Sequence, residues 1–520
     1  MTTNNIIVLC AFIAYMIIMI VIGFVCSKGN KNNEDYFLGG RNLGRWAALS
    51  AQASDMSGWL LMGLPGAVYL AGTGEAWIAV GLLIGTILNW YIVSARLRKY
   101  TIVAGNSLTI PSFFKNRYRD HKNIIKIVSA SIIAVFFTVY TASAFSSGAK
   151  LFATLFSDSA SGDENYNRVY VIGLIVAAVV ILVYTFMGGF KAVCTTDLIQ
   201  GLMMIVAILT VPVLAYAILT FDTSFSSALA AKGVEQPAQF LNFFVNGDGT
   251  PVSAVSIISN LAWGLGYFGM PHILVRFMAV KSNEEIKKSR KIAVVWVIIS
   301  LTASCLIGLI ARGYLTAQLD DATSESVFIR TIQQLFSGNG VLIFIGGIFL
   351  CGILAAIMST ADSQLLVTAS AGSEDLYKGA VKKNASEKSS LLVGKIAVAV
   401  VAVIAFFIAL NPKSSIMGLV SDAWAGFGSA FGPVVLLALF WKRSTLSGAI
   451  SGMATGALTV IIWDYIPLVN GQTLYAATNL YSLVVGFGLA LIVNVIVSLL
   501  SKKPSKEIMD EFDSIKNIEV

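Results

Sequence analysis

A carboxylate with neighbouring hydroxyls interrupts an apolar segment near residue 55. The string Ser54-Asp-Met-Ser-Gly58 is followed by Gly63, Pro65 and Gly66, all inside a run long enough to cross a bilayer. A carboxylate in mid-membrane is costly and normally faces a cavity, a partner or an ion. Glycine and proline free backbone groups from the helix, which is tolerated only beside other protein or a cavity. The pattern predicts a broken helix with Asp55 at a functional site.

A second string, Ala355-Ala-Ile-Met-Ser-Thr-Ala-Asp-Ser363, brings several oxygen atoms to one place. Ala356, Ser359 and Thr360 stand at i, i+3 and i+4, so one helix face presents a carbonyl and two hydroxyls. A dehydrated sodium ion needs several such oxygens, and carbonyls freed from a broken helix can supply others. Hydroxyls in membrane helices also bond back to their own i−4 carbonyls. The string therefore predicts an ion site only in combination with the broken helix.

A third string, Asn260–His272, carries Gly264, Gly266, Gly269 and Pro271 inside another apolar run. Small residues of this kind can simply let helices pack closely. Two interrupted segments at matching positions of two halves are, however, the best sequence indication of a central transport site. The two interrupted segments lie five spans apart, and this odd offset predicts an inverted repeat.

The composition identifies the elements that must position these residues. Of 520 residues, 56% are hydrophobic and 12% charged, and the mean hydropathy is +0.78, which predicts a polytopic membrane protein. The two histidines and five scattered cysteines form no metal-ligand spacing, and no phosphate-binding or nucleophile-elbow motif is present. An enzyme active site, an organic cofactor and transport fuelled by the chain's own ATP hydrolysis are not expected.

Thirteen segments are long and apolar enough to span the membrane. They are Ile6–Val25, Trp46–Leu70, Ala76–Val93, Ile127–Ser147, Val169–Met187, Leu198–Leu219, Ala254–Phe277, Ile292–Tyr314, Val341–Thr368, Leu391–Leu410, Met417–Phe440, Ala449–Trp463 and Leu480–Leu500.

The basic residues predict an N-out, C-in orientation. Only six of the 36 Lys and Arg residues fall in segments that this orientation places outside, namely Lys150, Arg168, Lys232, Arg312, Arg330 and Lys413. The net charge of +8 then follows from topology, and no nucleic-acid role is needed to explain it. The mixed-charge tail after residue 500 is expected to be solvated.

Five strings together resemble the sodium:solute symporter family over nearly the whole chain. They are Gly39-Gly-Arg41, Ser54–Gly66, Tyr184–Val193 with Asp197, Trp263–His272 and Ala355–Thr360. The Tyr184–Val193 string is typical of the family, whereas Ser54–Gly66 and Trp263–His272 point to its proline branch. The resemblance implies an all-α membrane protein of the LeuT type, with a five-plus-five inverted repeat of spans 2–6 and 7–11.

The same resemblance implies two sites. The sodium site would use Ala53, Met56, Ala356, Ser359 and Thr360, with Asp55 as the nearby negative charge. The proline site would use Ser57, Gly58, Tyr140, Trp263, Tyr267 and Pro271. Flat aromatic faces suit a pyrrolidine ring and its ammonium, although Trp and Tyr also anchor helices at lipid interfaces.

Three charged residues have two interpretations each. Arg41 can gate the inner exit or act as a positive-inside anchor. Asp197 can lie on the ion's exit route or cap a helix. Asp362 can raise the field near the sodium site or pair elsewhere in the bundle.

These observations predict a plasma-membrane Na+ symporter that imports L-proline by alternating access, with one ion per solute. The nearest alternative is the same mechanism with another small amino acid or a carboxylate, and more remote ones are an ion channel or a membrane solute sensor. The expected partners are proline, Na+ and lipid, with no nucleic acid, and the sequence identifies no protein partner. The predicted parts are residues 1–45 with the first span, 46–220 and 254–440 as the two repeats, 221–253 as an outer loop, 441–500 with two further spans, and 501–520 as a cytoplasmic tail.

Overall fold

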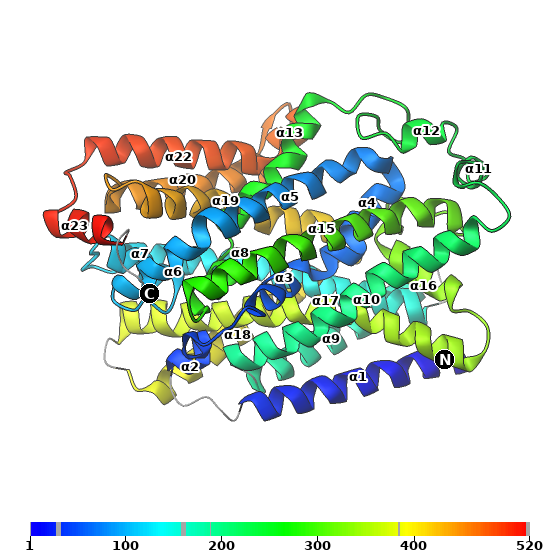
Figure 1. The fold of residues 1–520 in the computed structure, drawn as a ribbon, viewed down its shortest axis with the longest axis horizontal. Coiled ribbons are helices and arrows are strands. Elements are labelled where there is room, and N and C mark those ends of the chain that lie inside the picture. The colour runs from blue at the N-terminus through cyan, green and yellow to red at the C-terminus, as the bar shows by residue number, and fades with distance from the viewer. Residues whose placement is uncertain (1, 28–32, 158–162, 188, 383–384, 516–520) are drawn as a thin grey trace.

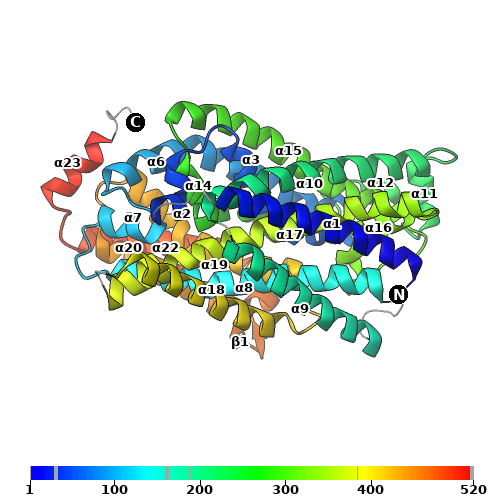
Figure 2. The same cartoon turned by 90° about the horizontal axis from the view of Figure 1, so that it is seen from below.

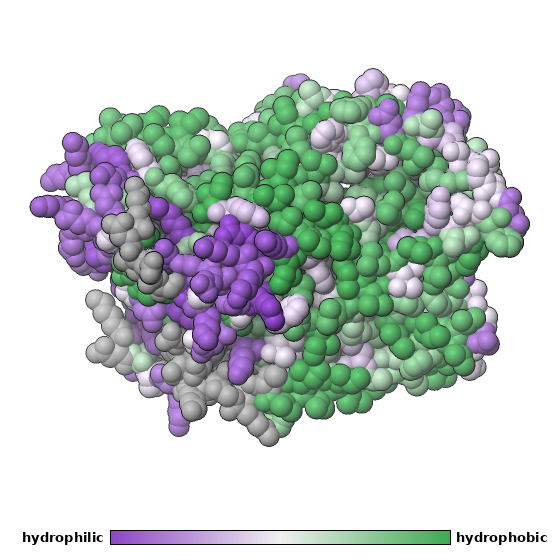
Figure 3. Space-filling model, in the orientation of Figure 1, coloured by the Kyte–Doolittle hydropathy of each residue, from purple (hydrophilic) through white to green (hydrophobic). Residues whose placement is uncertain are grey.

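The structure is a computed structural model that describes residues 2–27, 33–157, 163–187, 189–382 and 385–515. The helices run side by side along the long axis of the molecule, and the start of α1 and the C-terminal helix α23 lie at opposite ends (Figure 1). A broad hydrophobic surface separates two more hydrophilic ends (Figure 3). This distribution is that of a bundle embedded in a bilayer.

The long helices and the two interrupted ones form the body of the bundle. They are α1 (Thr3–Ser27), α3 (Ala47–Gly58), η2 (Trp59–Gly63), α4 (Leu64–Ala71), α5 (Trp77–Leu88), η4 (Asn89–Val93), α6 (Ser94–Val103), α8 (Ile124–Phe156), α9 (Glu164–Met187), α10 (Phe190–Leu219), α13 (Ala254–Ala262), η5 (Trp263–Phe268), α14 (Pro271–Ala279), α15 (Asn283–Tyr314), α17 (Gly340–Ser370), η7 (Ala371–Val381), α18 (Glu387–Ala409), α19 (Ile416–Phe440), α20 (Leu446–Tyr465) and α22 (Ser482–Leu500).

Short elements cover the two ends. They are α2 (Asn33–Leu38), η1 (Gly39–Arg41), η3 (Gly72–Ala76), α7 (Ile110–Arg117), α11 (Phe225–Ala231), α12 (Pro237–Phe240), η6 (Ser324–Ser326), α16 (Val327–Leu335), α21 (Leu474–Thr478), α23 (Lys506–Ser514) and the antiparallel pair β1 (Pro467–Val469) and β2 (Gln472–Thr473).

Among the described residues, 11 helices are long and apolar enough to cross a membrane. One of them, the 57-residue stretch Ala47–Val103, contains two predicted spans, and the predicted span Ala254–Phe277 begins on a shorter apolar helix, Ala254–Phe268. The all-α membrane fold is thus confirmed. The count of thirteen and the N-out orientation stay predictions.

The first predicted break lies at Ser57. Its φ of 46° and ψ of −178° take it out of the helix, and the chain resumes in the wide turn of η2. The Ser57 hydroxyl accepts a hydrogen bond from the Trp59 N–H at 3.1 Å, which compensates one freed backbone group. The break therefore exposes backbone to the bundle interior, where side chains can satisfy it.

The second predicted break lies at Gly269 and Met270. The tight turns of η5 end there, and α14 begins with Pro271, whose missing N–H costs nothing at a first helical position. A Cβ at Gly269 would lie 2.2 Å from the Phe427 carbonyl oxygen, so only glycine lets this turn approach α19.

Helix α17 lies at the centre of the bundle. It packs against α1, α3, α8 and α10, and every residue from Leu350 to Ser370 is buried. Its polar side chains are therefore held away from lipid and face other helices. This position explains how one helix can carry two hydroxyls and a carboxylate in mid-membrane.

Most charged side chains of the C-terminal tail are exposed as predicted, whereas its apolar residues pack against the bundle, which the charges did not indicate. Phe512 of α23 is 5% exposed and its ring lies 5.0 Å from the Arg96 guanidinium and 5.2 Å from that of Arg117. Glu511 pairs with Arg119 at 2.5 Å. Phe512 thus docks α23 on two arginines of α6 and α7, helices that lie at the same end of the bundle (Figure 2), while residues 516–520 lie outside the described part.

Candidate functional site

The predicted sodium-binding oxygens meet where α17 crosses the first break. The Ser359 hydroxyl donates to the Ala53 carbonyl at 2.9 Å and lies 3.2 Å from the Ala356 carbonyl. The Thr360 hydroxyl accepts from the Ser57 N–H at 2.9 Å. Two residues of α17, Ser359 and Thr360, are therefore in direct contact with residues of α3 that lie 306 and 303 positions earlier in the sequence.

These atoms are hydroxyl and carbonyl oxygens, the donor set that a hard cation prefers. The Met56 carbonyl lies at the break, where it accepts a hydrogen bond from the Trp59 N–H. The Met56 sulfur instead accepts a hydrogen bond from the Trp296 indole at 3.0 Å. A cation at this junction would bind the hydroxyl and carbonyl oxygens directly and would displace the hydrogen bond from the Ser359 hydroxyl to the Ala53 carbonyl. The set fits sodium as a transported ion.

Asp55 connects the two breaks. Its Oδ2 accepts a hydrogen bond from the Tyr267 hydroxyl at 2.6 Å, and Tyr267 lies on η5 in the second interrupted segment. Its Oδ1 is buried and has no hydrogen-bond partner among the described residues. One carboxylate oxygen is therefore held in place and the other is available to a ligand.

An aromatic pocket lies beside Asp55. About 390 Å³ in the pocket and at its opening is not filled by protein atoms. Its lining includes Gln52, Asp55, Met56, Trp59, Tyr140, Trp263, Tyr267 and Trp424. The Trp263 ring stacks on Trp59 with centroids 5.3 Å apart, and the Trp424 indole donates to the Trp263 carbonyl at 2.7 Å. Indole and phenol faces here surround a space that has a carboxylate at one side.

Three predicted proline-site residues are not part of this lining. Ser57 shapes the break, and Pro271 starts α14 after the second one. Gly58 contacts α8 so closely that a Cβ would lie 2.3 Å from the Ser147 hydroxyl oxygen. Their observed contacts position the two breaks.

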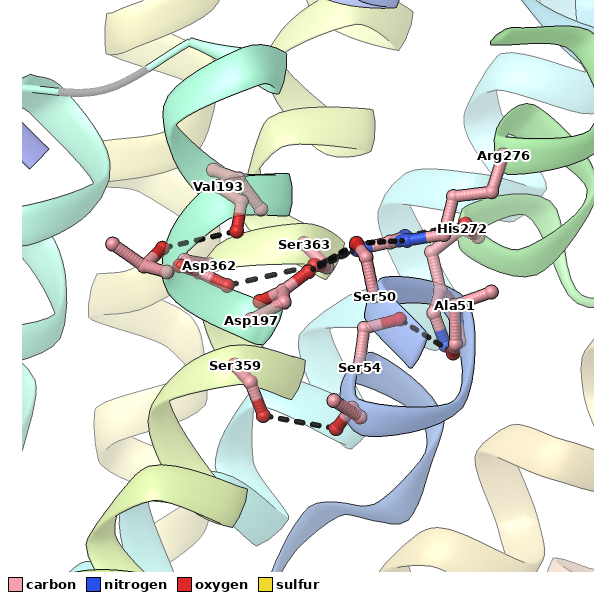
Figure 4. Close-up of polar contacts among 12 residues, drawn as sticks. Ser50, Ala51, Ser54, Val193, Asp197, His272, Arg276, Ser359, Asp362 and Ser363 are labelled. Atoms are coloured by element: carbon pink, nitrogen blue, oxygen red, sulfur yellow. Dashed lines mark hydrogen bonds and ion pairs between the residues drawn. The ribbon is translucent and has the colours of Figure 1, made fainter. Parts of the chain in front are cut away.

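Asp197 and Asp362 belong to a buried charged cluster (Figure 4). Asp197 Oδ2 lies 2.6 Å from an Arg276 nitrogen, and neither side chain is more than 2% exposed. Ser50 donates to the same carboxylate oxygen at 3.0 Å, and Ser363 lies 3.5 Å from Asp362 Oδ1. Asp197 is thus an ion-paired residue in the bundle interior. Because α10 begins at Phe190 with Gly189 as its N-cap, the interpretation of Asp197 as a helix cap is wrong.

Arg41 joins the loop after α6 to the end of α14. Its guanidinium donates to the Met278 and Ser107 carbonyls, both at 2.7 Å, and to the Asn106 side chain at 3.0 Å. These segments belong to different predicted repeats. Arg41 therefore links the two predicted repeats by hydrogen bonds, and its role as an inner gate stays a prediction.

A large cavity, called the outer cavity below, adjoins the aromatic pocket, and Trp263 lines both. The cavity has about 1540 Å³ of space, part of it open to solvent, and its lining includes Glu75, Asp422, Asp464 and Tyr481. The pocket on the Arg276 side is smaller, at about 310 Å³. The aromatic pocket is thus approached from the end of α13 and α20.

Comparison with known proteins agrees with this architecture. The model of the Sodium:solute symporter family matches residues 36–456. The chain belongs to the sodium:solute symporter family. Proteins named sodium/proline symporter from Staphylococcus aureus strains JH9 and COL are each 43% identical over 514 residues, which is 97% of this chain and 94% of the relative.

Solved structures share the fold of this sodium:solute symporter family member. A Na+-coupled sialic acid symporter in a substrate-bound outward-open state has a TM-score of 0.73 at 19% identity, over 96% of this chain and 99% of the other. A nucleobase-cation-symport-1 family transporter in a closed conformation with bromovinylhydantoin bound has a TM-score of 0.55 at 13% identity, over 94% and 99%. The LeuT-type fold is confirmed by these likenesses.

Sequence reasoning about this family member missed two residues of the site. Arg276 entered only the count of inner basic residues, although a charge inside a predicted span is itself a signal. Trp424 lies in mid-span on α19, far in sequence from either break. Its aromatic type and depth in the span were the available signals.

Proposed function

We propose that this chain imports L-proline together with Na+ across the plasma membrane by alternating access. The observation that carries the proposal is the contact of Ser359 and Thr360 with the first break, directly beside a pocket of indole and phenol rings. The printed names of the 43%-identical relatives support sodium and proline as the pair of solutes.

Sodium would act by joining two helices. An ion bound to the Ala53 and Ala356 carbonyls and to the Ser359 and Thr360 hydroxyls holds α17 against the broken α3. The negative charge of Asp55 favours a cation in this low-dielectric region. Ordering the break also fixes η2, whose Trp59 lines the solute pocket. Each ligand therefore raises the affinity for the other by the same factor.

Proline would lie among the aromatic rings. Its secondary ammonium suits the faces of Trp263 and Tyr140, and its ring buries apolar surface against them. Its carboxylate suits the N-terminal end of the half-helix that follows the break at Ser57. The large outer cavity gives the solute a route to this pocket.

The test is uptake of radiolabelled proline into proteoliposomes. We expect saturable accumulation under an inward sodium gradient and its abolition by a sodium ionophore. Full uptake driven by a proton gradient alone would refute sodium coupling. Counterflow with a panel of small amino acids and carboxylates then identifies the solute. A compound of the panel that exchanges faster than proline would favour another small amino acid or a carboxylate as the transported solute.

The same vesicles separate the remaining classes of protein. A channel would equilibrate the solute without accumulating it, and a sensor would bind it without flux. The paired broken helices favour the symporter, because such pairs are typical of transporters that bind their solute at the interface of two repeats.

A further inference from the structure

One guanidinium joins four helices on the inner side of the sodium-binding junction. Arg276 of α14 donates to Asp197 Oδ2 on α10 at 2.6 Å, to the Ser363 hydroxyl on α17 at 2.6 Å and to Ser50 Oγ on α3 at 3.3 Å. Its remaining nitrogen donates to the His272 carbonyl at 2.7 Å. Every nitrogen of the guanidinium is therefore used.

The partners of Arg276 continue the two helices that supply the sodium oxygens. Ser50 lies one turn before Ala53 on α3, and Ser363 lies one turn after Thr360 on α17. Both displacements lead toward the same end of the bundle, because the two helices run in opposite directions. The guanidinium thus bonds to residues one helical turn from the junction (Figure 4), on the side that the predicted orientation makes the inner one.

A small pocket begins on the far side of this guanidinium. Arg276 and Ser363 line it together with Phe37, Phe190 and Leu366. An ion that leaves the junction inward through this pocket must pass the Arg276 side chain. With its 2% exposure, that side chain separates the junction from the pocket.

Two carboxylate oxygens beside the guanidinium are not used. Asp197 Oδ1 and Asp362 Oδ2 are buried and have no hydrogen-bond partner among the described residues. A departing cation would meet both of them once the guanidinium moved. A buried charge without a partner is costly, so Arg276 or another cation stabilises the charged form of Asp197.

We propose that Arg276 is the inner gate of the sodium site, a tethered cation that holds Asp197 while the gate is closed and leaves with α14 when it opens. Asp197 and Asp362 then face the outgoing sodium ion. This gate rests on the proposed function, because it presumes an ion at the junction. Arg276 is a positioning residue and does not contact the solute.

The experiment measures access to the inner pocket from the cytoplasmic side. A single cysteine replaces Leu366 in the full-length chain, with the native cysteines substituted and transport retained. Inside-out vesicles are labelled with a membrane-impermeant thiol reagent, with and without Na+. We expect Arg276→Gln to raise the labelling rate about tenfold, since a lost gate shifts the population toward the open form. Sodium should slow labelling in the parent and no longer do so in the variant.

Two further variants keep the result interpretable. Arg276→Gln with Asp197→Asn removes both charges together, so a protein that the single change unfolds can still be tested. Lys287→Gln changes an exposed cation on α15 and should leave the rate unchanged. Parental labelling rates in both gate variants, each eluting as a folded monodisperse protein, would overturn the proposal.

Thr360→Ala separates this result from the proposed function. The sodium constant is the sodium concentration that gives half-maximal proline uptake. If Thr360→Ala leaves the sodium constant unchanged while Arg276→Gln raises labelling in the pocket, the gate proposal is supported and the sodium-site assignment is wrong. If the sodium constant rises and labelling does not, only the gate is refuted.

Discussion

The Thr360 hydroxyl accepts a hydrogen bond from the Ser57 N–H at 2.9 Å, which ties α17 to the first residue out of helical geometry. The neighbouring Ser359 hydroxyl makes the matching contact to Ala53 on the other side of Asp55. The break and the predicted ion-binding face are therefore one connected unit. Changes on α17 should alter sodium dependence before they alter folding.

Thr360→Ala removes one oxygen from the junction while keeping a good helix former. Losing one ligand to a charged partner costs about 1.5–3 kcal/mol, so the sodium constant for uptake should rise about ten- to hundredfold. The apparent proline constant should worsen at low sodium and recover at high sodium. Proline uptake measured against sodium concentration checks this, with Thr360→Ser as control. Equal losses in both variants would indicate packing rather than coordination.

Asp55→Asn keeps the volume of the side chain and removes its charge. Because the Tyr267 hydroxyl can still donate to the amide oxygen, the fold should survive. The sodium constant should rise at least about tenfold, since the charge opposite the cation is lost in a low-dielectric region. Asp464→Asn, the control, changes a more solvated carboxylate in the outer cavity. Its sodium constant should stay within about threefold of the parent value. Ordinary uptake by Asp55→Asn at physiological sodium would reduce Asp55 to a structural residue.

Trp263→Ala should act on proline rather than on sodium. Trp263 stacks on Trp59 at 5.3 Å and lines the aromatic pocket, whereas it has no contact with Ser359 or Thr360 among those described. Loss of an aromatic contact predicts a rise of about tenfold in the apparent proline constant at saturating sodium. Trp263→Phe retains a ring and should recover part of the affinity. Equal changes in both constants would place the solute elsewhere.

Gly58→Ala should disturb the first break by overpacking. The added Cβ would lie 2.3 Å from the Ser147 hydroxyl oxygen and 2.7 Å from its Cβ, and such clashes cost about 1–3 kcal/mol. We expect a lower melting temperature in detergent and reduced uptake, with partial rescue by Ser147→Gly. Gly488→Ala, which meets no atom within 4 Å, is the matched control. A Gly58→Ala variant as stable as the Gly488→Ala variant would show that α8 can move aside.

The sequence by itself determined where the helices break and which residue types surround the breaks. Membrane spans can be recognised in the sequence because a helix needs about twenty consecutive apolar residues to cross the lipid. Glycine, proline or a carboxylate inside such a span is rare, and each usually marks a break, a close contact or a functional site. Ser57, Gly269 and the Ser359–Thr360 face were predictable for this reason. Local spacing on one helix also fixes which hydroxyls share a face.

Only the tertiary structure decided which residues meet across helices. The pairs Asp55–Tyr267 and Arg276–Asp197 join segments far apart in sequence, and nothing in either segment specifies its partner. The charges of the tail predicted a solvated segment, yet Phe512 docks because two arginines from α6 and α7 converge on its ring. Long-range pairing depends on the packing of the whole bundle, and that packing is set by the shapes of many buried side chains together rather than by any local string.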